Sequence, residues 1–446
     1  MKTIFITAFN PFISRNILST DAFNFLKANS DIKIIILVPD YKVDYFVKRY
    51  SDNRISIEGI DSISFSRQDT LFRFLGSVLA DSRTLLIHNR ERYWEKGKVL
   101  KFLISIVFLK FFSHLGFIKR AVRLADLWTI NYRPIVKYFE KYQPDLIFAT
   151  DIFNDYDIKF LAAAKKFKKG TVGMIRSWDN FTTKGFFRVK PDKLIVHNEI
   201  IHDEAMRFGG MRPRDIFISG IPQFDHYFTG VRTSREAFFK KINLNPSQKL
   251  ILFSPNGKRF WDIDWHFMEI LKNSGYQILI RLTPNDEVSL DGFIPNNKCF
   301  IDKPGYQFKP GISRDQELDI ADLNWLADCL ANCDVAVVGG ATIGIDAAIF
   351  KKPVILIGFD GLEKRPYMKS VARWLDFNHV RRVYESGSFK LAKSPEDLLR
   401  KIEFYIRNSE ADWEQRSKFV KEQCYKIDGQ SGKRIAEFLL ERSRWT

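Results

Sequence analysis

The sequence predicts an α/β protein with two doubly wound lobes, each built on a mostly parallel sheet. Short apolar runs alternate with longer segments of helical periodicity, which is the pattern of repeated βα units. Runs such as LILFS (250–254) and VAVVG (335–339) are continuously apolar, as expected for strands covered on both faces. With 446 residues, 45% of them hydrophobic, the chain can form two domains of ordinary size.

The predicted elements alternate along both halves of the chain. In the first half we predict strands at 3–8, 32–37, 145–149, 172–175 and 193–197, with a helix at 160–168. In the second half we predict strands at 250–254, 278–282, 335–338 and 353–358, with helices at 323–331, 343–350, 394–407 and 431–441. The stretch 228–245 is polar and charged, so we expect a first lobe at 1–230 and a second at 245–430.

The charge balance favours an anionic partner. Lys and Arg outnumber Asp and Glu by 70 to 53, for a net charge of +17. These charges are spread along the chain, without a zinc-finger spacing or an aromatic RNA-reading motif, so we expect no nucleic-acid partner.

The four cysteines form no CxxC pair, and we interpret them as reduced thiols. The seven histidines have no ligand spacing, and the two DxD triplets (155–157 and 262–264) match chance, so we predict no metal site.

One strongly apolar stretch has two open interpretations. The segment 99–118 is interrupted by Lys101 and Lys110, which makes it a poor membrane-spanning candidate. It reads either as a buried helix of the first lobe or as a peripheral element whose basic flanks, within 90–123, contact an anionic membrane. The first strand is too short for a secretion signal, so we expect a cytoplasmic protein, with the membrane alternative placing it on the inner face.

The strongest local motif is a strand that runs into two glycines and then a helix, DVAVVGGATIGID (334–346). Gly339 and Gly340 would let a ligand approach the backbone, and the helix that begins near Thr342 would offer free N–H groups to a diphosphate. Asp346, one turn later, could accept hydrogen bonds from ribose hydroxyls. The alternative is an ordinary turn with a capping Thr and a first-turn Asp. The spacing matches neither a Walker loop nor GxGxxG, which disfavours an ATPase or a dinucleotide oxidoreductase.

Further polar residues follow other predicted strands of the second half and would extend the same site. Arg281 could bind phosphate oxygens with its guanidinium, although a salt bridge at the rim explains it equally well. The remaining candidates at these strand ends are Ser254, Lys258 and Asp360.

In the first half, RSWDNFTTKG (176–185) follows a predicted strand. Trp178 could stack on a sugar face, and Ser177, Asn180 and Lys184 could bind sugar hydroxyls. The alternative is a turn stabilised by Asp179 and Asn180. Two more candidates for acceptor binding, Asn10 and Arg15, follow the first strand, and Asp151 follows the strand at 145–149.

Five segments along the chain carry a family resemblance: RSWDNFTTKG (176–185), SGIPQFDHY (219–227), ILIRLTPND (278–286), VVGGATIGIDAAIFKKPVILIGFDG (337–361) and DGQSGKRIAEFL (428–439). In this order they resemble the GT-B glycosyltransferase superfamily, in particular bacterial surface-polysaccharide transferases. The same segments resemble CDP-glycerol glycerophosphotransferases and non-hydrolysing UDP-GlcNAc 2-epimerases.

The resemblance implies two Rossmann-like lobes facing across a cleft, an acceptor-side first lobe and a donor-binding second lobe. It places Gly340, Ala341 and Thr342 at the diphosphate and Asp346 at the ribose, without a metal or other cofactor. It also implies that the closing segment, 431–446, packs back towards the first lobe. Thr283-Pro284 stands where the glycerophosphotransferases have a His-Pro pair, which argues against histidine-dependent phosphotransfer.

The expected activity is glycosyl transfer from a nucleotide sugar to a hydroxyl of a glycan or lipid-linked acceptor in surface polysaccharide synthesis. Asp179 and Asp151 are the candidate bases for that hydroxyl. Two alternatives share the fold: a nucleotide-sugar epimerase or hydrolase, and a CDP-glycerol-type phosphotransferase. A third alternative, of another class, is a non-catalytic basic binding protein.

Overall fold

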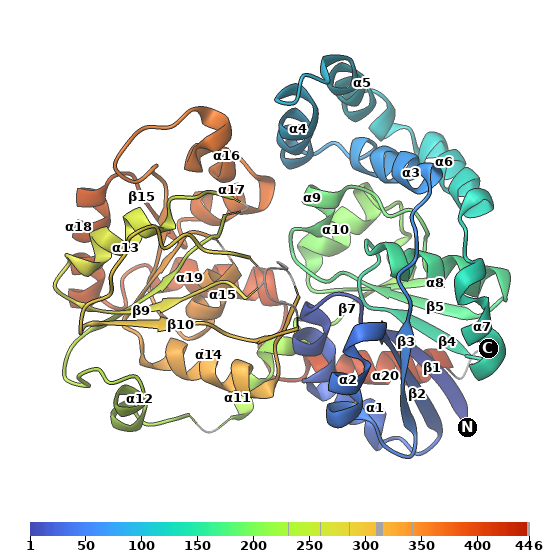
Figure 1. The fold of residues 1–446 in the computed structure, drawn as a ribbon, viewed down its shortest axis with the longest axis horizontal. Coiled ribbons are helices and arrows are strands. Elements are labelled where there is room, and N and C mark those ends of the chain that lie inside the picture. Colours follow the sequence, from blue (N-terminus) through green and yellow to red (C-terminus); the bar gives the residue numbers. More distant parts are fainter. Residues whose placement is uncertain (231, 259, 285, 309–314, 341, 444–446) are drawn as a thin grey trace. The chain divides into compact units, whose positions relative to one another are not determined.

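The computed structural model describes residues 1–446 except 231, 259, 285, 309–314, 341 and 444–446. It divides into unit 1, residues 1–225 and 424–446, and unit 2, residues 226–423 (Figure 1). Each unit is a parallel sheet covered by helices, so the predicted α/β class is confirmed.

Unit 1 contains a parallel sheet in the order β3-β2-β1-β4-β5-β6-β7. Its strands are β1 (Lys2–Thr7), β2 (Ile32–Pro39), β3 (Ile55–Ile60), β4 (Leu146–Ala149), β5 (Gly170–Met174), β6 (Lys193–Val196) and β7 (Ile216–Ile218). Its longer helices are α1 (Asp21–Ala28), α2 (Val43–Tyr50), α3 (Arg67–Val78), α4 (Arg83–Asn89), α5 (Val99–Lys110), α6 (Gly116–Thr129), α7 (Arg133–Tyr142), α8 (Asp155–Lys166), α9 (Asn180–Lys184), α10 (Glu199–Arg207) and α20 (Ser431–Ser443).

Unit 2 contains a parallel sheet in the order β10-β9-β8-β13-β14-β15. Its strands are β8 (Leu250–Ser254), β9 (Gln277–Arg281), β10 (Cys299–Asp302), β13 (Val335–Val338), β14 (Val354–Ile357) and β15 (Lys390–Ala392), with the hairpin β11 (Tyr306–Gln307) and β12 (Gln316–Glu317) beside it. Its helices are α11 (His226–Thr229), α12 (Arg235–Lys241), α13 (Asp264–Lys272), α14 (Ile320–Asn332), α15 (Thr342–Ile349), α16 (Val371–Leu375), α17 (Asn378–Glu385), α18 (Pro395–Arg407) and, at the boundary, α19 (Trp413–Cys424).

In both sheets the first strand is an inner strand. The next two strands in sequence lie on one side of it, and the later strands lie on the other side. The reversal, or switch point, lies between β1 and β4 in unit 1 and between β8 and β13 in unit 2. The carboxyl ends of the two strands that flank a switch point leave a crevice in which open α/β sheets bind ligands. The topology therefore gives each unit one preferred binding edge.

The closing helix α20 belongs to unit 1 and packs against α1. Gly432 permits this approach, because a Cβ there would lie 2.5 Å from the backbone nitrogen of Ala22. The carboxylate of Asp225 accepts a hydrogen bond from the Gly432 N–H at 2.7 Å, which fixes the start of the helix.

Between β3 and β4 the chain forms the helices α3 to α7, of which α3 to α6 make up the upper part of unit 1 in Figure 1. The apolar helix α5 buries only Ser105 and Leu109, so the interpretation of this stretch as a buried helix is wrong. Among the described residues, no single helix is both long and apolar enough to cross a membrane. The pair 99–114 and 116–129 meets that condition only together, and it is bent by 109°.

Candidate functional site

The switch point of unit 2 brings together the ends of β8 and β13. Val338 lies opposite Ser254 in the parallel register, and the Gly339 N–H donates to the Ser254 carbonyl at 2.9 Å. The loop that follows β8 and the glycine turn that follows β13 therefore meet at the edge where a ligand is expected.

The two glycines are needed first for packing between these loops. A Cβ on Gly339 would lie 2.7 Å from Cζ2 of Trp261, and one on Gly340 would lie 2.6 Å from Oδ1 of Asn256. The Nδ2 group of buried Asn256 has no hydrogen-bond partner among the described residues. A buried donor without a partner is costly, so this amide is a candidate contact for an anionic ligand.

A buried carboxylate holds the loop after β8 in place. Asp264, which begins α13, accepts hydrogen bonds from the N–H groups of Asn256 and Gly257 at 3.0 and 2.8 Å. It also accepts one from Nε1 of Trp261 at 2.7 Å. Burial raises the pKa of Asp264 to about 6. From the sequence, the DxD triplet at 262–264 had no role beyond a chance match, whereas the structure shows that Asp264 positions Asn256.

Helix α15 begins at Thr342, which is exposed, and Ala341 lies outside the described residues. Asp346, one turn further, is buried and accepts a hydrogen bond from the hydroxyl of Tyr227 at 2.5 Å. A ribose would have to compete with Tyr227 for this carboxylate. The contact between Asp346 and a ribose stays a prediction.

The other candidates in unit 2 already have protein partners. Arg281 is buried and forms an ion pair with Asp302 on the neighbouring strand β10. Exposed Lys258 pairs with Glu287 at 2.7 Å. Asp360 accepts hydrogen bonds from the hydroxyl of Ser370 and from the N–H groups of Arg365 and Val371. These three side chains stabilise strand ends and loops, and any ligand contact would have to replace those bonds.

The switch point of unit 1 contains two buried carboxyl groups. Asp157 accepts hydrogen bonds from the Thr7 hydroxyl at 2.5 Å and from the Asp151 N–H at 3.1 Å. Burial, together with the nearby charge of Asp151, raises the pKa of Asp157 to about 8. Asp157 is therefore a protonated acid at neutral pH.

Asp151 has the opposite electrostatic environment. Its Oδ2 accepts from Nε of Arg176 at 2.8 Å and lies 3.5 Å from Nζ of Lys184. Burial alone would raise the pKa of Asp151, but the charges of Lys184 and Arg176 hold it below its usual range. Asp151 is thus ionised, enclosed and engaged with two cations.

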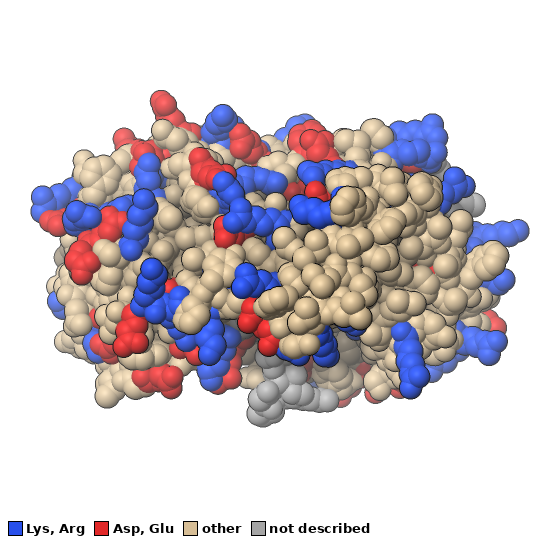
Figure 2. Space-filling model, turned by 90° about the horizontal axis from the view of Figure 1, so that it is seen from above, with Lys and Arg blue, Asp and Glu red and all other residues tan. Residues whose placement is uncertain are grey.

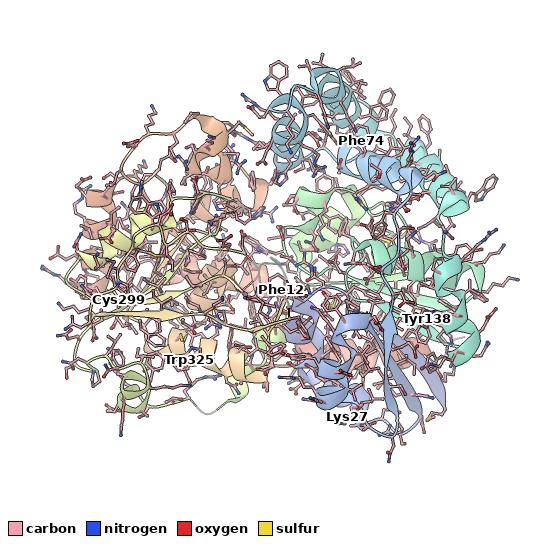
Figure 3. All side chains as sticks on the ribbon, in the orientation of Figure 1. Phe12, Lys27, Phe74, Tyr138, Cys299 and Trp325 are labelled. Carbon is pink, nitrogen blue, oxygen red and sulfur yellow. The ribbon has the colours of Figure 1, made fainter. Side chains whose placement is uncertain are left out.

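Phe12, which is marked in Figure 3, lies in the segment after β1 and has two guanidinium groups beside its ring, that of Arg15 and that of Arg176 from the loop after β5. Arg15 and Arg176 lie 4.7 and 5.6 Å from the centre of this ring. Asn16 accepts from Nε of Arg15 and donates to the carbonyl of Arg176. Asn10 turns the loop by accepting from the Phe12 N–H at 3.1 Å. The predicted Arg15 therefore lies beside Arg176, which the sequence did not single out.

In the loop after β5, the structure places two of the predicted sugar-binding residues inside the unit. Trp178 is only 6% exposed, so its ring has no open face on which a sugar could stack. Asn180 is buried and accepts from the Ser177 N–H at 3.2 Å, which is the alternative role as a turn residue. Ser177 and Asp179 are half-buried, and Asp179 accepts from the Thr183 hydroxyl at 3.3 Å.

Sequence reasoning missed His197, which follows β6 at the same edge of unit 1. It is buried, and neither ring nitrogen has a hydrogen-bond partner among the described residues. Burial, with a smaller contribution from the charge of Arg15, lowers the pKa of His197 to about 4. Its place at the end of a predicted strand was the available signal, because polar residues there line the binding edge.

The neutral state of His197 makes unit 1 sensitive to acid. The pKa of a histidine in an unfolded chain is about 6.5, so this group stabilises the fold above pH ~6.5 and that stability is lost as pH falls towards ~4. His197→Leu is apolar and of similar size, and it should remove on the order of 3 kcal/mol of this pH dependence. Urea denaturation of both proteins at several pH values measures the difference. A difference that is constant from pH 4 to 7 would contradict a neutral His197.

No group of three or more His, Cys, Asp or Glu side chains in the described part of the chain could hold a metal ion.

Known structures share this fold along almost the whole chain. A UDP-GlcNAc 2-epimerase from Methanocaldococcus jannaschii, in complex with UDP-GlcNAc and UDP, is 16% identical, covers 99% of this chain and 100% of its own, and has a TM-score of 0.55. A glycosyltransferase from Rickettsia africae is 11% identical over 99% of each chain, with a TM-score of 0.51. The wall teichoic acid polymerase TagF is 11% identical, covers 100% of this chain and 89% of its own, and has a TM-score of 0.52.

These neighbours are enzymes of the GT-B type, and the chain has their α/β fold. No protein-family model matches the sequence, and no curated protein matches it either.

Proposed function

We propose that the protein is a glycosyltransferase whose nucleotide-sugar donor binds at the edge formed by β8 and β13 of unit 2. The observation that carries the proposal is the Gly339-Gly340 turn at this switch point, beside Nδ2 of Asn256, which has no hydrogen-bond partner within the described part of the chain. Backbone N–H groups at the start of α15 and this amide would bind the diphosphate as it leaves. The donor acts as a substrate, and the proposal includes no metal or other cofactor.

A uridine nucleotide is the first donor to test. The epimerase from Methanocaldococcus jannaschii, which shares this fold, was solved with UDP-GlcNAc and UDP. The shared fold supports a nucleotide-sugar partner and leaves the sugar to be identified.

The acceptor would be a hydroxyl of a glycan or of a lipid-linked sugar, bound at the edge of unit 1. Asp179 is the better base of the two candidates, because it is half-buried, whereas Asp151 is buried. Asp151 is enclosed and paired with Arg176 and Lys184, so it acts as a positioning residue for these cations. Arg15 and Arg176 would attract a phosphate-bearing acceptor to this edge.

A nucleotide-sugar epimerase is the second candidate function. It is favoured by the epimerases among the structural neighbours and by Asp157, a buried acid that stays protonated near neutral pH. An acid of this kind could donate a proton to a sugar intermediate. Epimerisation needs no acceptor, and this difference separates the two functions.

The test is product analysis with purified protein and UDP-sugars, with and without a membrane extract that supplies glycan and lipid-linked acceptors. Glycosyl transfer predicts a sugar-labelled acceptor and free UDP, both dependent on the extract. An altered UDP-sugar that forms without extract would instead establish an epimerase. Transfer from CDP-glycerol in a parallel reaction would identify a phosphotransferase. No turnover of any donor would favour a non-catalytic binding protein.

A further inference from the structure

Helix α5 exposes an apolar stripe to solvent. The stripe consists of Leu100, Leu103, Ile104, Val107 and Phe111, of which Leu100 and Phe111 are 73% and 69% exposed. At 100° per residue these five positions fall within an arc of about 100° on one side of the helix. Lys101 and Lys110 lie at the two borders of this arc. A helix of a globular unit normally turns such a stripe inwards, so its exposure requires an explanation.

Helix α6 repeats the pattern with three large apolar side chains. Phe117 and Trp128 are 70% and 89% exposed, and Leu124 lies between them on the same side of the helix. Arg120 is exposed at the border of this stripe. Together these eight side chains form what we call the apolar face: Leu100, Leu103, Ile104, Val107, Phe111, Phe117, Leu124 and Trp128.

The opposite side of α6 is fixed to the rest of unit 1. Nε of Arg123 donates to the carbonyl of Phe187 at 3.0 Å, and its Nη2 donates to that of Gly209 at 2.6 Å. Buried Asp126 forms an ion pair with Arg188 at 2.7 Å. Because these contacts fix how α6 is rotated, the outward orientation of its apolar side chains is built into the fold.

A recess of about 710 Å³ opens beside the α5 stripe, between α3 and α5. Leu71, Phe74, Leu100 and Ile104 form part of its apolar wall, and Arg67 and Lys98 contribute cations. Phe74 is labelled on α3 in Figure 3. The recess thus combines an apolar floor with positive charge, as the stripe does.

We propose that the apolar face docks on the surface of an anionic lipid bilayer, with α5 and α6 lying in the headgroup region. Seen from above in Figure 2, a broad area without charged side chains covers this part of unit 1 and has Lys and Arg at its borders. Apolar side chains would enter the acyl boundary, while the bordering cations meet lipid phosphates. The two helices meet at a bend of 109°, and neither is long and apolar enough to cross a bilayer. Both can therefore lie along the membrane surface.

The charge of the surroundings favours a bilayer over a second copy of this chain. The stripes are bordered by Lys101, Lys110 and Arg120, and the chain as a whole has a net charge of +17. Two such faces brought together would place like charges side by side, whereas an anionic membrane neutralises them. The inference does not depend on the proposed activity.

Sedimentation with lipid vesicles tests the proposal. Wild-type protein should bind vesicles of phosphatidylcholine with about 30% phosphatidylglycerol, and bind pure phosphatidylcholine more weakly. The triple variant Leu100→Ser, Phe111→Ser and Phe117→Ser should lower the partition coefficient at least tenfold. The control variant Ile294→Ser, Leu362→Ser and Phe404→Ser changes three other exposed apolar residues, in unit 2, and should bind as the wild type does.

Two further measurements keep the test decisive. Trp128→Phe should keep vesicle binding but reduce the blue shift of tryptophan emission that anionic vesicles produce, since Trp128 would enter the headgroup region. Thermal unfolding of the triple variant should match the wild type, because the replaced side chains are exposed. The proposal is overturned if the wild-type protein does not bind anionic vesicles, or if the blue shift is unchanged in Trp128→Phe. It is also overturned if the wild-type protein forms a dimer by light scattering, does not bind vesicles, and loses the dimer in the triple variant.

Discussion

Gly340→Val is expected to lower donor affinity at least about a hundredfold, which corresponds to about 2.8 kcal/mol of binding free energy. A Cβ at this position would lie 2.6 Å from Oδ1 of Asn256, so a branched side chain displaces the amide proposed to bind the diphosphate. The added methyl groups would also cover the N–H groups at the start of α15. Turnover at low donor concentration measures the loss.

Gly116→Val is the matched control for this variant. A Cβ at Gly116 meets no described heavy atom within 4 Å, and the residue belongs to unit 1, whereas the β8–β13 edge belongs to unit 2. Donor affinity in this control should equal that of the wild type. Equal donor affinity in both variants would place the nucleotide elsewhere.

Arg188→Ala should destabilise unit 1 by about 3–5 kcal/mol, because it leaves the buried carboxylate of Asp126 without its cation and removes one of the two buried cations beside Asp69. Arg188 is buried and forms ion pairs with Asp126 of α6 at 2.7 Å and with Asp69 of α3 at 3.1 Å. The loss should appear as faster hydrogen exchange in α3 and α6, measured with the protection of unit 2 as an internal reference.

Arg400→Ala serves as the comparison for Arg188→Ala. Arg400 is exposed and pairs with Asp397 on the surface of α18, so its loss should cost less than about 1 kcal/mol. Similar small effects from both replacements would mean that Arg188 does not hold the helices α3 and α6 to the segment that precedes β6.

The central strands could be predicted from the sequence, and the edge strands could not. The apolar runs at 250–254 and 335–338 coincide with β8 and β13. The strands β3, β7, β10 and β15 were missed, and each is an outermost strand of its sheet. These edge strands are partly exposed. They are either short, as is the three-residue β7, or include polar residues, as does β3 with Glu58, so a search for continuous apolar runs passes over them.

The missed edge strands also explain why some site residues were misjudged. Arg281 looked like a phosphate ligand because its partner, Asp302, lies on the unpredicted strand β10. Sequence position located the loops at the carboxyl ends of strands, but it could not tell which way a side chain points within a loop. Trp178 therefore looked available, although the fold buries it. The same limit hid Asn256, whose importance depends on its approach to Gly340 from a distant part of the sequence.

In the proposed function, a nucleoside diphosphate binds to unit 2 between the glycine turn and Asn256. Isothermal titration calorimetry of the wild type and Gly340→Val with UDP tests this most directly, with GDP, CDP and dTDP as further ligands. We predict one site per chain in the wild type and a loss of at least about a hundredfold in affinity in Gly340→Val. Binding of none of these nucleotides, or equal affinity in both proteins, would contradict the account.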